Sequence, residues 1–93
     1  MANYGDIVYS HYRSAWTPPP GLDDESISVT ASVTIARDGQ VLRHEIKKRS
    51  GNVAMDSSID ATMENVTFID AFPAESKDSQ RTYTIRFSPG KDR

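Results

Sequence analysis

The sequence ISVTASVTIARDGQVLRHEI, residues 27–46, decides the fold of this chain. Its first half alternates apolar residues with serine and threonine, and the apolar positions are Ile27, Val29, Ala31, Val33 and Ile35. Such alternation is typical of a β-strand with one buried face, because successive side chains of a strand point to opposite sides of the sheet. We therefore predict a strand over residues 27–37.

The dipeptide Asp38-Gly39 follows this strand, and the alternation then returns in residues 40–48. An Asp-Gly pair between two alternating segments is a strong signal for a β-hairpin with a two-residue primed turn. We therefore predict a second strand over residues 40–48. The predicted turn sets a register in which Ile35 faces Leu42, Val33 faces His44 and Ala31 faces Ile46.

Three further elements flank the hairpin. Apolar residues at helical spacing predict a helix over residues 3–16, which Asn3 caps and Pro18-Pro19-Pro20 ends. A second helix is predicted over residues 53–66, and its buried side consists of Val53, Met55, Ile59, Met63 and Val66. The alternation of Tyr83, Ile85 and Phe87 predicts a last strand over residues 81–87. Between these two elements we expect three residues to pack against the core, namely Phe68, Ile69 and Phe72.

The order helix–strand–strand–helix–strand determines the sheet. The second and third strands are joined through a helix, which requires a crossover connection. A right-handed crossover that skips one strand places the third strand beside the first. We predict a two-layer α+β sandwich, in which both helices cover one face of a three-stranded antiparallel sheet of order 2-1-3. The 93 residues are expected to form one domain, residues 1–93.

The composition limits the classes of function. A formal net charge of -2 gives no bulk attraction to nucleic acid or to anionic lipid. The absence of cysteine excludes disulfides, thiolate catalysis and zinc bound by cysteine. The short basic run Lys47-Lys48-Arg49 lacks interleaved aromatic residues, so we interpret it as a solvated strand edge.

No group of residues forms a recognisable catalytic or metal site. The two histidines, His11 and His44, are expected to pack beside the core. Three carboxylates recur at four-residue steps on the second helix, and three more follow one another in the connection before the first strand, but a solvated surface explains both sets: Asp56, Asp60 and Glu64, and Asp23-Asp24-Glu25. We therefore expect no enzyme activity, no cofactor and no metal.

Several short motifs, in this order and at this spacing, resemble those of TonB/TolA-type C-terminal domains. The first helix runs into a Trp-x-Pro-Pro motif, an Asp-Gly hairpin follows, and a Ser-Gly-Asn motif opens the second helix. Phe-Pro follows that helix, and Phe-Ser-Pro follows the last strand. The residues concerned are Trp16-Thr17-Pro18-Pro19, Asp38-Gly39-Gln40-Val41, Arg49-Ser50-Gly51-Asn52 with Met55-Asp56, Phe72-Pro73 and Phe87-Ser88-Pro89.

The resemblance implies a periplasmic domain of a Gram-negative bacterium, anchored to the inner membrane through a segment absent from this chain. It also implies that a proton-driven complex in that membrane energises the parent protein. The domain would then bind a short segment of an outer-membrane receptor and couple this energy to transport. A TolA-like role, with a periplasmic protein as partner, is the alternative. Two alternative hypotheses come from other classes of function. One is a small nucleic-acid-binding domain, and the other is an enzyme with a site shared across an oligomer.

The last strand is the expected docking site, because in the predicted order it forms one edge of the sheet. Unpaired backbone groups at a sheet edge can hydrogen-bond an extended peptide. The predicted partner-binding residues are Arg81, Thr82, Tyr83, Thr84, Ile85, Arg86 and Phe87. Edge pairing between two copies of the chain is left open. The second strand ends in Lys47-Lys48-Arg49, and such charges are typical of a protected edge.

Overall fold

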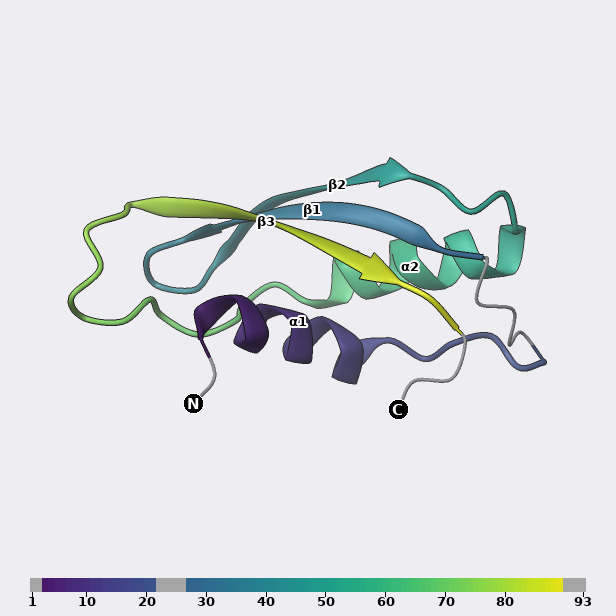
Figure 1. Ribbon diagram of the computed structural model, residues 1–93, viewed down its shortest axis with the longest axis horizontal. Helices are drawn as coiled ribbons and strands as arrows, with labels where there is room; N and C mark the ends of the chain where they lie inside the picture. The colour runs from purple at the N-terminus through teal and green to yellow at the C-terminus, as the bar shows by residue number, and fades with distance from the viewer. Residues whose placement is uncertain (1–2, 22–26, 90–93) are drawn as a thin grey trace.

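In a computed structural model of the chain, which describes residues 3–21 and 27–89, two helices and three strands form two layers (Figure 1). The elements are α1 (Tyr4–Ala15), β1 (Val29–Ala36), β2 (Val41–Lys48), α2 (Val53–Asn65) and β3 (Gln80–Phe87). The sheet is antiparallel with the order β2-β1-β3, and both helices lie on one of its faces. The predicted architecture is confirmed. The acidic stretch Asp23-Asp24-Glu25 lies outside the described residues.

Both helices begin at an asparagine that satisfies a free backbone donor of the first turn. The Asn3 side chain accepts a hydrogen bond of 2.9 Å from the backbone N–H of Asp6. The Asn52 side chain accepts one of 2.9 Å from the backbone N–H of Met55. These caps place the start of each helix within one residue of its predicted start at residue 3 or 53.

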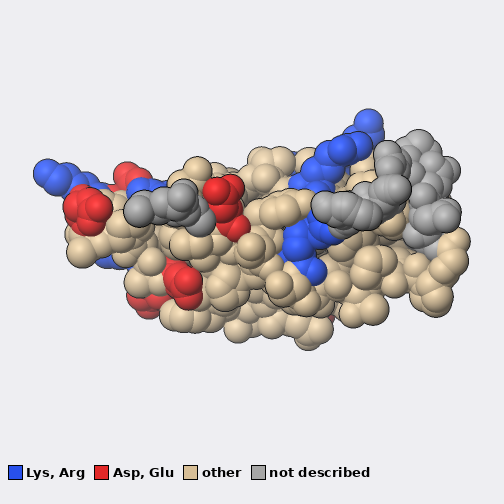
Figure 2. Space-filling model, turned by 60° about the horizontal axis from the view of Figure 1, so that its bottom comes forward, with Lys and Arg blue, Asp and Glu red and all other residues tan. Residues whose placement is uncertain are grey.

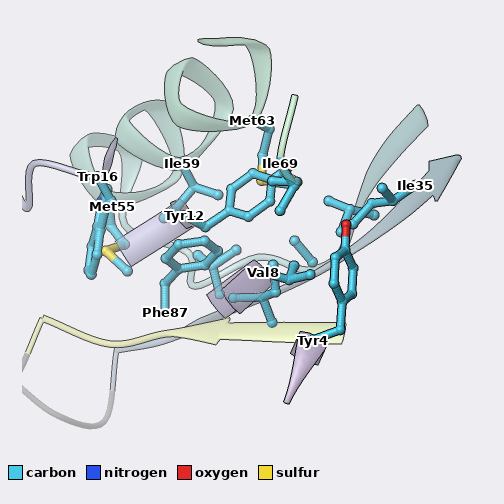
Figure 3. Packing of buried hydrophobic residues seen from close by; sticks show 14 of the residues in the cluster. Tyr4, Val8, Tyr12, Trp16, Ile35, Met55, Ile59, Met63, Ile69 and Phe87 are labelled. Atoms are coloured by element: carbon cyan, nitrogen blue, oxygen red, sulfur yellow. The ribbon is translucent and has the colours of Figure 1, made fainter. Parts of the chain in front are cut away.

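The core lies between the sheet and the two helices (Figure 3). β1 contributes Val29, Ala31, Val33 and Ile35 of the predicted alternation, and α1 and α2 cover them. The neighbouring strand β3 adds Ile85 and Phe87 to the same face. The indole of Trp16 packs edge-on against Phe87, with 5.3 Å between ring centres, and its Nε1 donates a hydrogen bond of 2.9 Å to Ser58. The largest buried side chains are Tyr12, Phe87, Ile35, Met55, Ile59, Met63, Ile69, Val8, Val29 and Val33.

Two residues that were predicted to be buried are exposed. Val53 is 81% exposed because it is the first residue of α2, where no element covers it. Phe68 is 57% exposed, whereas Ile69 and Phe72 are buried as predicted. Phe68 lies in an extended segment, where neighbouring side chains point to opposite sides, and Ile69 takes the position that faces the core.

The hairpin turn has three residues and not the predicted two. The backbone N–H of Gly39 donates to the carbonyl of Ala36, and the N–H of Ala36 donates to the carbonyl of Gln40, both at 2.9 Å. Arg37, Asp38 and Gly39 therefore form the loop. Gly39 has a φ of 97°, which is the left-handed conformation that a three-residue hairpin loop requires of its last residue.

The longer turn changes the register at the start of β2. Ile35 pairs with Val41, and an irregularity between Thr34 and Ile35 then absorbs Leu42 as an extra residue. The predicted pairs of Val33 with His44 and of Ala31 with Ile46 are confirmed beyond this point. The predicted contact of Ile35 with Leu42 is wrong, and the displaced Leu42 is 45% exposed.

The segment that follows α2 packs on the hairpin turn. Three backbone hydrogen bonds of 2.8–2.9 Å join the two, from Val41 to Thr67, from Ile69 to Gly39 and from Phe72 to Arg37. A Cβ atom at Gly39 would lie only 2.7 Å from the carbonyl carbon of Asp70. The glycine therefore allows both the turn and the close approach of residues 67–72.

Candidate functional site

β3 is the edge strand on the side away from β2. It pairs with β1 over its full length, from Gln80 opposite Ala36 to Phe87 opposite Val29, without a shift in register. Among residues 3–21 and 27–89, no backbone group pairs with the outer side of β3. A regular strand with one unpaired side is a template for a further strand.

The ladder with β1 determines which backbone groups point outward. The N–H of Arg37 donates to the carbonyl of Ser79 at 3.0 Å, in the same register as the β1–β3 pairs. Hydrogen-bonded pairs alternate with non-bonded pairs along an antiparallel ladder. The backbone groups of Arg81, Tyr83, Ile85 and Phe87 therefore point toward β1. Those at the even positions between them, Thr82, Thr84 and Arg86, point toward the open edge.

The side chains of β3 divide in the same way between two faces. Ile85 and Phe87 are buried under the helices, and Tyr83 is half-buried with its ring centre 5.8 Å from that of Tyr4. Thr82, Thr84 and Arg86 are exposed on the face that carries no helix. On this face the hydroxyl oxygens of Thr34 and Thr82 lie 2.9 Å apart. Of the predicted site residues, Ile85 and Phe87 thus serve the core through their side chains.

Arg81 holds the connection before β3 in place. Its guanidinium lies 4.7 Å from the ring centre of Phe72 and donates hydrogen bonds to Asp78 at 2.8 Å, Ser76 at 3.0 Å and Tyr83 at 3.1 Å. Hydrogen bonds to Tyr83 and Asp78 raise the pKa of Arg81 above its ordinary value. The Arg81 side chain therefore fixes the start of β3, a role that the strand pattern alone does not indicate.

The outer side of β2 is a poorer template than that of β3. The segment after α2 occupies its beginning, where Gln40 bridges to Phe68 and Val41 donates to Thr67. The β1–β2 register shifts at two places, and such irregularities twist an edge away from a flat template. Exposed Lys47 and Lys48 follow, as the sequence indicates for a protected edge.

The histidines lie apart from the open edge of β3 and differ in environment. His11 is partly buried, with its Nε2 3.9 Å from a carboxylate oxygen of Asp70. His44 is exposed, so the prediction that it packs beside the core is wrong. His44 lies on the predicted face of the sheet, opposite Val33. However, β2 is an edge strand, and a hollow between β2 and the end of α2 leaves the imidazole uncovered.

Two of the three carboxylates of α2, Asp56 and Asp60, have structural partners. Asp56 accepts hydrogen bonds from the Ser50 backbone N–H at 2.9 Å and from its hydroxyl at 2.8 Å. Burial opposes ionisation of Asp56, but these donors lower its pKa overall. Asp60 lies 3.4 Å from Arg49. Within the part of the chain that the structure describes, no group of His, Asp and Glu could hold a metal ion, and no helix could cross a membrane.

Comparison with known proteins places these features in a family. The family model described as TonB C terminal matches residues 1–87. A solution NMR structure of TolAIII bound to a peptide derived from the N-terminus of TolB is 25% identical to this chain, with a TM-score of 0.68. The similarity covers 94% of this chain and 73% of that one. A search of curated proteins finds no match. Because the family model spans nearly all of the sequence, the chain belongs to the family of TonB C-terminal domains.

Proposed function

We propose that this chain is a periplasmic partner-binding domain that adds an extended segment of another protein as a further strand beside β3. The observation that carries the proposal is the regular outer side of β3, where the backbone groups of Thr82, Thr84 and Arg86 have no partner among the described residues. Membership of the TonB C-terminal family supports it. Support also comes from the similar fold of TolAIII, which was solved with a peptide bound.

The backbone alone provides weak binding. The N–H and C=O groups of the three outward residues offer up to about 6 kcal/mol if each hydrogen bond contributes about 1 kcal/mol. Ordering a disordered segment costs about 2–5 kcal/mol of this. Affinity must then come from side chains, or from tethering that keeps the partners close together. We expect a dissociation constant of about a micromolar, which corresponds to about 8 kcal/mol.

The finer proposal is that the partner is an outer-membrane receptor. In this role, an inner-membrane proton-driven complex energises the parent protein through a segment outside this chain. The TolA-like alternative, a periplasmic protein as partner, draws on the similarity to TolAIII bound to a TolB peptide. Titration with N-terminal peptides of a TonB-dependent receptor and of TolB, both from the same bacterium, distinguishes the two by which peptide binds more tightly.

Proline substitutions on the two edges test strand addition. Thr84→Pro removes an outward N–H without removing a β1–β3 hydrogen bond, and proline is tolerated at such edge positions. His44→Pro is the matched control on β2. His44 pairs with Val33, whose backbone groups point toward β3, so the backbone of His44 also points away from β1.

We expect both proline variants to stay folded and Thr84→Pro alone to weaken binding of the tighter peptide by about tenfold, or about 1.4 kcal/mol. Amide chemical shifts of the two variants report the fold and the peptide titration together. Unchanged binding by Thr84→Pro would place the docking site elsewhere. Loss of binding only in His44→Pro would move it to β2.

A further inference from the structure

α1 runs beside β3 on the helix side of the sheet (Figure 1). The first residue of the helix, Tyr4, contacts Tyr83, and Trp16, just after its end, contacts Phe87. Helix and strand therefore run in the same direction along the open edge. A strand added to β3 would extend the sheet past the flank of α1.

One stripe of α1 faces this open edge. A Cβ atom at Gly5 would lie 3.5 Å from the Tyr83 ring, which places Gly5 against β3. Tyr9 lies one helical turn further along the same stripe, because residues four apart share a helix face. Tyr9 is 42% exposed, so part of a large aromatic ring is accessible on the side of α1 that faces the open edge of β3.

Arg13 holds the ring of Tyr9 in position. Its guanidinium donates a hydrogen bond of 2.6 Å to the Tyr9 hydroxyl. The same group lies 5.5 Å from the ring centre of Tyr9 and 5.7 Å from that of Trp16. A rigid aromatic side chain with few rotatable bonds loses little entropy when it contacts a partner.

The other face of the open edge is polar and ends in a positive charge. Thr82 and Thr84 are exposed there, and exposed Arg86 makes no ion pair with another described residue. The complement for an acidic residue of a partner is therefore Arg86, near the end of β3. On the opposite side, where Figure 2 brings the helices forward, acidic side chains lie mainly in the left half, and basic ones lie at the left tip and in the middle.

Side chains of an added strand alternate between these two faces. We propose that the stripe of α1 beside β3 is part of the docking site and selects a partner segment in which apolar and polar residues alternate. The apolar residues of the partner segment contact Tyr9, next to Gly5, which has no side chain to obstruct them. Its small polar residues lie beside Thr82 and Thr84. An Asp or Glu of the polar set faces Arg86. This inference rests on the proposed function, because it requires strand addition to β3.

A random peptide library, with peptides as long as the 8 residues of β3, tests the proposal. Selection on the wild-type chain is expected to enrich alternating apolar and polar residues with one acid. Tyr9→Ala should weaken the selected peptides about tenfold, or about 1.4 kcal/mol. Phe68→Ala removes an exposed aromatic ring beside the opposite edge and should change nothing. Selection on Arg86→Glu should replace the acid by Lys or Arg.

Two outcomes would overturn the inference while strand addition stands. Selected peptides without alternation, or peptides that bind Tyr9→Ala as tightly as the wild type, would show that α1 is not part of the docking site. In both cases, amide shifts at Thr82, Thr84 and Arg86 would still locate the peptide on β3. Failure to enrich any peptide, or shifts confined to other elements, would overturn the proposed function together with the inference.

Discussion

Replacing Gly39 with alanine should destabilise the domain by about 4–5 kcal/mol, far more than the same substitution at a glycine whose new Cβ would meet no neighbour. Gly39 has a φ of 97°, and a residue with a Cβ pays about 1–2 kcal/mol to stay in this conformation. The new Cβ would also lie 2.7 Å from the carbonyl carbon of Asp70 and 3.1 Å from the backbone nitrogen of Ala71. Both are backbone atoms, so no rotation of a side chain relieves the overlap.

Relief of this overlap requires residues 67–72 to move away from the turn. Three hydrogen bonds of 2.8–2.9 Å cross this contact, from Val41 to Thr67, from Ile69 to Gly39 and from Phe72 to Arg37. At about 1 kcal/mol each, their loss adds about 3 kcal/mol to the conformational strain. The same movement would uncover the beginning of the outer side of β2.

Gly51→Ala is the matched control, because Gly51 has a φ of 89° and nothing lies within 4 Å of the position that its new Cβ would take. This variant should show only the strain of about 1–2 kcal/mol. Urea unfolding measures both variants, and similar slopes would show that the comparison concerns stability alone. Equal losses in Gly39→Ala and Gly51→Ala would refute the claim that packing of residues 67–72 on the turn contributes to stability.

Further predictions concern the core, a helix cap and the start of β3. The buried Tyr12 hydroxyl has no partner among the described residues, so Tyr12→Phe should raise the free energy of unfolding by about 1 kcal/mol; a decrease would contradict this. Burial raises the pKa of Tyr12 to about 12, so the wild type should lose stability between about pH 10 and pH 12, where the unfolded chain ionises first, and Tyr12→Phe should lose less. Asn52→Ala should lower the free energy of unfolding by about 1 kcal/mol in thermal or urea unfolding, because the N–H of Met55 loses its cap. Arg81→Lys should speed amide exchange in residues 76–79, because the guanidinium that contacts Phe72 and Ser76 is lost. Unchanged exchange would contradict the claim that Arg81 holds the connection before β3 in place.

The strand order could be predicted from the sequence because each signal was local. The alternation in residues 27–35 gives the buried face of β1, and helix 53–66 forces the crossover that puts β3 at the edge. The turn could not be predicted in the same way. Asp38-Gly39 suits both a two-residue and a three-residue loop, and the choice depends on residues 67–72, which pack on it from far along the chain.

The site was predictable as a strand but not as a set of side chains. Alternation identifies β3, and its edge position follows from the topology. Two contacts join segments that no local pattern connects: the Arg81 guanidinium lies against the Phe72 ring, and Gly5 lies against Tyr83. The position of Tyr9 beside the open edge depends on the same packing, so its exposure became evident only from the structure.

Amide hydrogen exchange in the free protein tests the central claim most directly, that the outer side of β3 is unpaired. The N–H groups of Tyr83 and Ile85 bond to β1 and should be protected, whereas those of Thr82 and Thr84 should exchange at rates near those of solvent-exposed amides. An alternating pattern along the strand is the result we predict. Uniform protection from residue 82 to residue 85 would show that the edge is already occupied, and would contradict the account.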